Sequence, residues 1–225
     1  MRRLLLVPHA ATAATRAAAF PRGDEPLEAR ARAAAAALAD ALAPRFELLA
    51  SPARACRETI AAAGLGAATE EPALADCDWG AWTGRTLAEV AANEPEGIAA
   101  WRTDPASRPH SGESLAALVA RAGGWLDGQA ALDGAVVAIT HAAVVRAALV
   151  HALGAPLEAC WRIDAAPLSI SELHAREGRW TMTRVNAAVT GVAGAAGSGE
   201  RDAAPGAHGA DRRGRQPAAR RGSLA

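Results

Sequence analysis

The chain has 225 residues, of which 51% are apolar, and its 24 basic residues, all arginine, balance 24 acidic ones. This length and apolar content predict one globular domain with a full core. A formal net charge of zero provides no long-range field, so we expect neither nucleic acid nor a membrane surface as a partner. The sequence also holds no uncharged apolar run of about 18 residues, and we expect a cytoplasmic protein.

Strand-like and helix-like segments alternate along the first 186 residues. Short apolar runs at 4–7, 46–50 and 135–139 are typical of buried parallel strands. Helices are predicted over 26–42, 51–63, 111–129 and 143–153, shorter helical pieces over 86–102, and two last strands over about 168–174 and 179–185. This alternation predicts an α/β fold, a three-layer α/β/α sandwich with a mostly parallel central sheet.

The composition changes after residue 186. Residues 187–225 are rich in Ala, Gly and Arg, and no large apolar residue stands between Val192 and Leu224. Such a segment cannot bury enough surface to offset its ordering entropy. We therefore predict one folded domain over 1–186 and a disordered Ala/Gly/Arg-rich tail over 187–225.

Two histidines follow two of the apolar runs. His9 comes directly after Pro8 at the end of the first run, and His141 comes after Thr140 at the end of the run 135–139. Ligands of open α/β sheets bind just beyond the carboxyl ends of the strands. The two imidazoles are therefore predicted to share one pocket, where one could take up a phosphoryl group and the other could bind it.

Six short motifs stand in a fixed order around these histidines. They are Val7-Pro8-His9-Ala10-Ala11-Thr12, Asp24-Glu25-Pro26-Leu27, Ser51–Thr59, Leu74–Gly84, Ser111–Leu115 and Thr140–Arg146. In this order they resemble Arg-His-Gly followed by an acidic residue and Thr or Ser, Asp-x-Pro-Leu, Ser-x-x-x-Arg-Ala-x-x-Thr, Leu-x-Glu-x-x-Phe-Gly-x-Trp-Glu-Gly, Gly-Gly-Glu-Ser and Ser-His-Gly-x-x-x-Arg. Residues 3–186 thus resemble the histidine phosphatase superfamily, the phosphoglycerate-mutase-like proteins.

The resemblance implies a role for four side chains. His9 would be the nucleophile that becomes a phosphohistidine, Arg54 would bind phosphate oxygens, and His141 would donate a further hydrogen bond. Asp76, at the place of the family's Glu, would protonate the leaving alkoxide and then activate water. Positioned donors suit a phosphoryl transition state, whose charge spreads over three oxygens, and a guanidinium matches two of these oxygens at once.

The sequence departs from the family pattern at several places. Pro8 stands where the family has its first arginine, and the loss of such a ligand commonly costs about 10²-fold in rate. One hypothesis is that Arg16 supplies the missing charge, and the alternative is a solvated loop residue. Further candidate substrate-binding residues are Thr15, Glu113 and Ala142, which replaces a glycine of the family pattern. Glu113 could instead be an acidic residue at the start of a helix.

We therefore expect a metal-independent phosphomonoester hydrolase that acts on a small phosphorylated metabolite and needs no cofactor. The sequence contains no His-x-x-x-His pattern and no close His/Cys/Asp cluster, so it predicts no metal site. The alternatives are an impaired relative that binds a phosphorylated ligand or partner, and a phosphoglycerate mutase. Arg146 is expected to be structural, and Trp79 and Trp82 to serve packing, with substrate stacking as the alternative. The sequence leaves the oligomeric state open.

Overall fold

A computed structural model describes residues 1–42 and 45–189. The disorder predicted for 190–225 lies outside the described residues. The last strand runs to Ala187, and Val189 is buried in the core. Described structure therefore continues to Val189, past the predicted domain end at residue 186.

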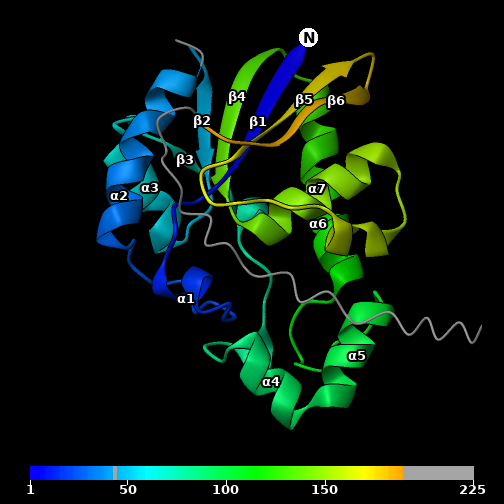
Figure 1. Cartoon of the computed structure of the whole chain (residues 1–225). Helices are drawn as coiled ribbons and strands as arrows, with labels where there is room; N and C mark the ends of the chain where they lie inside the picture. The colour runs from blue at the N-terminus through cyan, green and yellow to red at the C-terminus, as the bar shows by residue number, and fades with distance from the viewer. Residues whose placement is uncertain (43–44, 190–225) are drawn as a thin grey trace, which may run out of the picture. The chain divides into compact units, whose positions relative to one another are not determined.

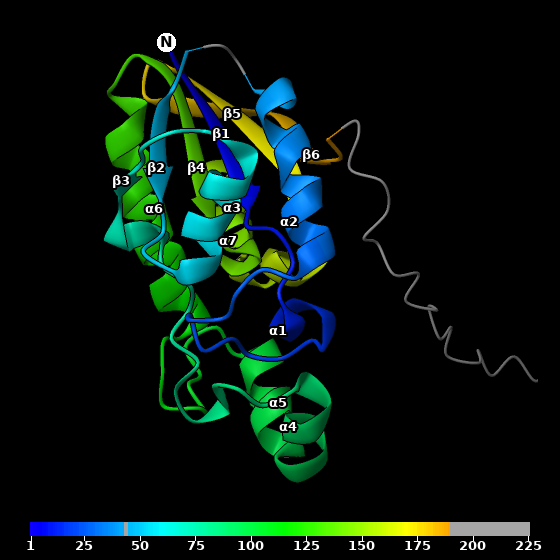
Figure 2. The same ribbon diagram turned by 90° about the vertical axis from the view of Figure 1, so that its left-hand side faces the viewer.

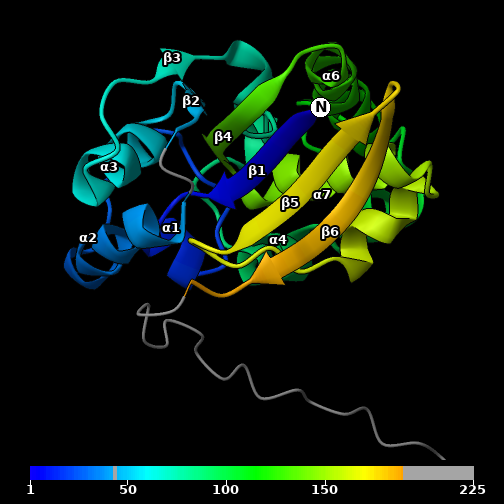
Figure 3. The same cartoon turned by 90° about the horizontal axis from the view of Figure 1, so that it is seen from above.

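Among the described residues, six strands form one mixed sheet in the order β3-β2-β4-β1-β5-β6 (Figure 3). They are β1 (Arg2–Pro8), β2 (Glu47–Ala50), β3 (Thr69–Glu70), β4 (Gly134–Thr140), β5 (Ile170–Arg176) and β6 (Arg179–Ala187). The first four pair in parallel, whereas β5 pairs antiparallel with both β1 and β6. Because β1 and β4 are parallel neighbours, their carboxyl ends meet at one edge of the sheet.

Helices cover both faces of this sheet (Figures 1 and 2). Successive residues of a strand point to opposite faces, so Leu4 and Leu6 of β1 pack with one hydrophobic cluster and Leu5 and Val7 with the other. The first cluster contains α6 (Leu115–Ala130) and α7 (Ala142–Leu153), and the second contains α2 (Ala29–Ala35) and α3 (Arg54–Ala63). This arrangement confirms the predicted three-layer α/β fold with a mostly parallel sheet.

Further elements lie beyond the carboxyl ends of the parallel strands (Figure 1). These are α1 (Ala13–Arg16), α4 (Leu87–Asn93) and α5 (Pro95–Thr103). Pro95 separates α4 from α5, because the residue before a proline is disfavoured in the helical conformation. Four 3₁₀ turns complete the described elements: η1 (Ala36–Ala41), η2 (Pro72–Leu74), η3 (Gly80–Trp82) and η4 (Leu157–Arg162).

The helix predicted over 26–42 is shorter in the structure. Leu27 forms an antiparallel bridge with Thr12, and its N–H donates to the Glu58 carboxylate. These contacts hold the backbone extended, so α2 begins only at Ala29 and tightens into η1 after Ala35. The consequence for the site is that the segment before α2 is tied to the loop that follows β1.

The loop around η3 is fixed by a close backbone approach. Gly80 has φ +47°, and a Cβ atom there would lie 2.0 Å from the carbonyl oxygen of His110. His110 is fully buried, and its Nδ1 accepts a hydrogen bond from the Gly112 N–H at 3.0 Å. Glycine at position 80 therefore lets the segment 78–82 pack directly on the segment 110–112.

Candidate active site

His9 lies immediately after β1, at the carboxyl end of the sheet. Its backbone N–H donates to the Thr140 carbonyl at 2.8 Å, and its ring Nδ1 lies 2.8 Å from the carbonyl oxygen of Ala10. A carbonyl oxygen can only accept, so Nδ1 carries the proton. In the neutral ring, Nε2 then holds the free lone pair. His9 is therefore oriented to act as a nucleophile through Nε2.

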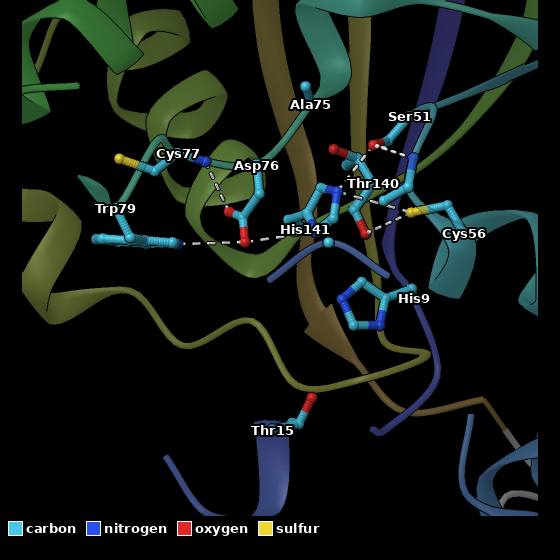
Figure 4. Close-up of polar contacts among 12 residues, drawn as sticks. His9, Thr15, Ser51, Cys56, Ala75, Asp76, Cys77, Trp79, Thr140 and His141 are labelled. Atoms are coloured by element: carbon cyan, nitrogen blue, oxygen red, sulfur yellow. Dashed lines mark hydrogen bonds and ion pairs between the residues drawn. The ribbon is translucent and has the colours of Figure 1, made fainter. Parts of the chain in front are cut away.

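His141 lies beside it at the end of β4, where it is the N-cap residue of α7. The two ring centroids are 5.1 Å apart, with the ring planes at 74° (Figure 4). His141 Nε2 is 2.8 Å from the Ser51 hydroxyl, and Nδ1 is 3.6 Å from Asp76 Oδ2. The structure thus brings together the two imidazoles that the sequence places after two distant apolar runs.

Burial controls the charge of His141. Its side chain is only 5% exposed, and this desolvation lowers its pKa to about 4 against the attraction of Asp76. The ring is therefore neutral at pH 7. The adjacent carboxylate favours the proton on Nδ1, and the Ser51 hydroxyl then donates to Nε2. Nδ1 is buried and has no hydrogen-bond partner among the described residues, so it is available to an incoming oxygen atom.

The low pKa of His141 predicts a pH-dependent stability. The unfolded imidazole, with a pKa of 6.5, binds a proton that the folded one does not bind until about pH 4. The free energy of unfolding should therefore fall as pH drops from 6.5 to 4, by about 3 kcal/mol for this group. Urea unfolding at several pH values, compared with His141→Asn, measures this contribution. Equal slopes in both proteins between pH 4 and 6.5 would contradict it.

Asp76 completes the group of three. Its Oδ1 accepts a hydrogen bond from the Cys77 N–H at 2.8 Å, and Oδ2 lies 3.5 Å from the Trp79 indole nitrogen (Figure 4). The carboxylate therefore stands between the His141 ring and the indole of Trp79. The shorter Asp side chain still reaches His141 from the segment where the family has Glu.

Arg121 fixes the backbone that carries Asp76, a role that the sequence analysis missed. Its Nη1 donates to the carbonyls of Ala73 and Ala75 at 2.8 and 2.9 Å, and its Nη2 donates to that of Asp76 at 3.2 Å. The same guanidinium binds both carboxylate oxygens of Glu113 at 2.9 and 2.7 Å. Glu113 therefore does not line the pocket, contrary to the substrate-binding expectation, because Arg121 occupies its carboxylate.

We expect Arg121→Lys to lower kcat about 10-fold with a smaller change in KM. A lysine ammonium cannot reproduce the planar fork that holds three carbonyls and one carboxylate, so Asp76 would lose its fixed position. Steady-state kinetics give the two constants. Arg184→Lys on β6 is the matched control, since Arg184 contacts only Glu172 among the described acidic residues. A loss confined to KM would contradict the positioning role.

The two histidines and Asp76 line a pocket of about 480 Å³. His9, Asp76 and His141 lie in it together with the predicted Thr15 and Ala142. Figure 4 shows Thr15 apart from the other labelled residues, on the far side of His9. Arg146 also lines the pocket, whereas we expected a structural residue. The signal that could have found it is its place in the motif Thr140–Arg146, one turn into the helix that His141 caps.

The two arginines that the sequence predicts for the site, Arg54 and Arg16, are not among the residues that line the pocket. The Nε of Arg54 donates to Glu58 at 2.8 Å, and its Nη1 is 3.5 Å from the Asp24 carbonyl. Ala53 and Ala55 on either side of Arg54 line the pocket, but Arg54 itself is not among the lining residues. Arg16 pairs with Glu28, and its side chain is 74% exposed, so the structure does not place its charge in the pocket.

The described residues contain neither a metal-binding cluster nor a membrane-spanning helix. No group of three or more His, Cys, Asp and Glu side chains within 1–42 and 45–189 is arranged to hold a metal ion. In the same residues, no helix has both the length and the apolar character that a membrane span needs.

The family of the chain follows from a match to a family model. Residues 4–188 match the model of the histidine phosphatase superfamily (branch 1). The chain belongs to this superfamily. The family model covers most of the described structure, including both histidines, Asp76 and Arg121, and it confirms the resemblance drawn from the six motifs.

One curated relative matches about half of the chain. Phosphoserine phosphatase 1 of Hydrogenobacter thermophilus is 28% identical over 120 residues, which are 52% of this chain and 57% of that protein. The chain therefore matches little more than half the length of this curated relative.

Solved structures share the fold. A mycobacterial glucosyl-3-phosphoglycerate phosphatase in complex with VO3 has a TM-score of 0.75 at 24% identity, and 84% of this chain and all of that one are covered. A phosphoserine phosphatase variant from Entamoeba histolytica has a TM-score of 0.75 at 18% identity, with 83% and 97% covered. The α-ribazole phosphatase of Shigella flexneri has a TM-score of 0.73 at 21% identity, with 82% and 96% covered.

Proposed function

We propose that this histidine phosphatase relative is a phosphomonoester hydrolase that acts through a phosphohistidine on a small phosphorylated metabolite in the cytoplasm. The observation that carries the proposal is the arrangement of His9 and His141, with ring centroids 5.1 Å apart, beside Asp76 in one pocket. The three described cysteines are free and buried, as suits a reducing compartment.

We assign each chemical step to a side chain of this pocket. His9 Nε2 attacks phosphorus, the ester P–O bond breaks, and protonated Asp76 gives its proton to the leaving oxygen. Water then attacks the phosphohistidine, Asp76 takes a proton from it, and the P–N bond breaks to release phosphate. The Nδ1–H of His141 and the first N–H groups of α7 are positioned donors for the phosphoryl oxygens. No step requires a metal ion or another cofactor.

Two guanidinium groups are available to the phosphate. Arg146 lines the pocket, and among the described residues it has no carboxylate partner, since its Nε donates to the Ile163 carbonyl at 2.9 Å. Arg54 is the phosphate ligand that the family pattern implies, and only its Nε donates a hydrogen bond to a described carboxylate. Arg146 is therefore the candidate to supply the charge that the arginine at position 8 would have given, and Arg54 keeps the role that the family pattern implies.

Arg54→Ala is expected to lower kcat/KM about 10²-fold, because a charge-assisted ligand of the transferring phosphoryl group is lost. Arg16→Ala is the matched arginine control, because Arg16 is exposed and pairs with Glu28, and it should change kcat/KM by less than about twofold. Steady-state hydrolysis of an aryl phosphate measures both. The reverse order of effects would assign the missing charge to Arg16.

The proposal is tested with purified full-length protein and p-nitrophenyl phosphate in the presence of a chelator. Sustained release of nitrophenol and inorganic phosphate is the expected result. Phosphoglycerate is tested as a second compound. Its isomerisation without release of phosphate would instead show a mutase.

A second candidate function is a non-catalytic protein that binds a phosphorylated ligand or partner. Pro8 favours it, because proline has no side chain that could bind phosphate. Saturable vanadate binding in calorimetry, together with no turnover of any ester, would establish this function and overturn hydrolysis.

A further inference from the structure

The part of the pocket next to Asp76 is walled by three indoles. Trp79 lies just before η3, Trp101 lies on α5, and Trp161 lies in η4, and all three line the pocket. We call these three residues the aromatic wall. They come from three segments that are distant in the sequence, so the wall depends on the fold and not on a single motif.

The aromatic wall is held by edge-to-face contacts. The Trp101 and Trp161 ring centroids are 4.5 Å apart at 66°, and those of Trp79 and Trp101 are 6.0 Å apart at 77°. Phe20 packs behind it, with its centroid 5.0 Å from that of Trp79. Such pairs are the preferred geometry of aromatic rings and restrict their rotation. The wall is therefore a fixed surface in the pocket.

The wall begins at the proposed acid. The Trp79 indole nitrogen is 3.5 Å from Asp76 Oδ2, the carboxylate proposed to protonate the leaving oxygen. A substrate that places its ester oxygen at Asp76 therefore directs its leaving group along the indoles. Leu87, Leu115 and Leu118 add to the apolar lining.

Polar partners for a leaving group are few in this pocket. Among the described lining residues, the charged side chains besides Asp76 and the histidines are Glu25 and Arg146. The hydroxyls are those of Thr12 and Thr15, which lie within hydrogen-bond distance of each other, and the buried Trp161 indole nitrogen is a further donor without a described partner. With Arg146 proposed to bind the phosphate, a sugar acid or an amino acid would leave most of its hydroxyl, ammonium or carboxylate groups without partners along the indoles, and burying unpaired polar groups is unfavourable. A flat apolar group gains from the same surface.

We infer that the substrate of this site is a phosphate monoester with a flat, apolar leaving group, such as an arylalkyl phosphate. This inference rests on the proposed hydrolase function and adds the substrate class. The site should therefore bind arylalkyl phosphates more tightly than glycerol phosphate or phosphoserine, whose leaving groups are small and polar.

The test compares two primary-alkyl esters, so that leaving-group reactivity is matched. Calorimetry with the His9→Ala protein gives the Kd of 2-(2-naphthyl)ethyl phosphate and of glycerol 1-phosphate without turnover. We expect the naphthyl ester to bind about 10²-fold more tightly, in line with the value of apolar contacts in a specificity pocket. Equal Kd values, or tighter binding of glycerol phosphate, would overturn the inference. Hydrolysis by the wild type is scored separately, so failure of the hydrolase proposal is distinguished from failure of this one.

A variant pair assigns the preference to the wall. Trp161→Leu removes a ring but keeps an apolar side chain, and it should narrow the ratio of the two Kd values about 10-fold. Trp180→Leu, on β6 and outside the pocket lining, is the matched control and should leave the ratio as in the parent. A ratio unchanged by Trp161→Leu and by Trp101→Leu would contradict a role for the wall.

Discussion

His9→Ala is expected to abolish ester hydrolysis, with a fall in kcat of at least about 10³-fold, as for other enzymes that lose their nucleophile. The neighbouring His141 cannot replace it, because its Nε2 accepts a hydrogen bond from the Ser51 hydroxyl and its Nδ1 carries the proton. Steady-state release of phosphate from p-nitrophenyl phosphate measures the loss. His151→Ala, at the far end of α7 and paired with Asp127, is the matched histidine control.

The covalent intermediate gives a second measurement of the same prediction. Wild-type protein denatured in alkali during turnover should carry one phosphoryl group on the peptide that contains His9, since phosphohistidine survives alkali and is lost in acid. A phosphorylated His141 peptide, or full activity in the His9→Ala protein, would assign the nucleophile elsewhere.

Asp76→Asn is expected to lower kcat about 10²- to 10⁴-fold for alkyl phosphates, the usual range for a lost general acid. An alkoxide leaves poorly without a proton, whereas nitrophenolate leaves readily on its own. The loss should therefore be much smaller for p-nitrophenyl phosphate in the first step. Single-turnover rates for glycerol 1-phosphate and p-nitrophenyl phosphate measure the difference.

Asp76→Glu is the control for this prediction, because it keeps the carboxyl group at the longer reach of the family's Glu. We expect it to retain most of the alkyl phosphatase activity, since Asp76 Oδ2 faces the pocket beside His141. Equal losses for the alkyl and aryl esters in Asp76→Asn would show that the residue acts on the phosphoryl group and not on the leaving oxygen.

The sheet and its helices followed from local patterns of the sequence. The apolar runs of β1 and β4, and the two strands predicted over about 168–174 and 179–185, agree with the structure to within two residues. The start of α2 could not be predicted in this way. It depends on the bridge between Leu27 and Thr12, a contact between segments that only the folded chain brings together.

The same division holds within the site. His9, His141 and Asp76 could be placed because each stands in a motif with a defined position relative to a strand or loop. The contacts of Glu113, Arg16 and Arg146 could not, because a long charged side chain takes the partner that the tertiary fold offers. Arg121 belongs to no motif, and its role depends on three carbonyls from a segment that lies more than 40 residues earlier in the chain.

The aromatic wall also allows ligand binding in the pocket to be followed by intrinsic tryptophan fluorescence. The sequence has six tryptophans and no tyrosine, so ultraviolet emission comes almost entirely from indoles. Three of these line the pocket, and Trp82 packs 5.7 Å from Trp101. Occupancy of the cavity should therefore quench or shift the intrinsic fluorescence, and a stopped-flow instrument could follow ligand entry in unlabelled protein.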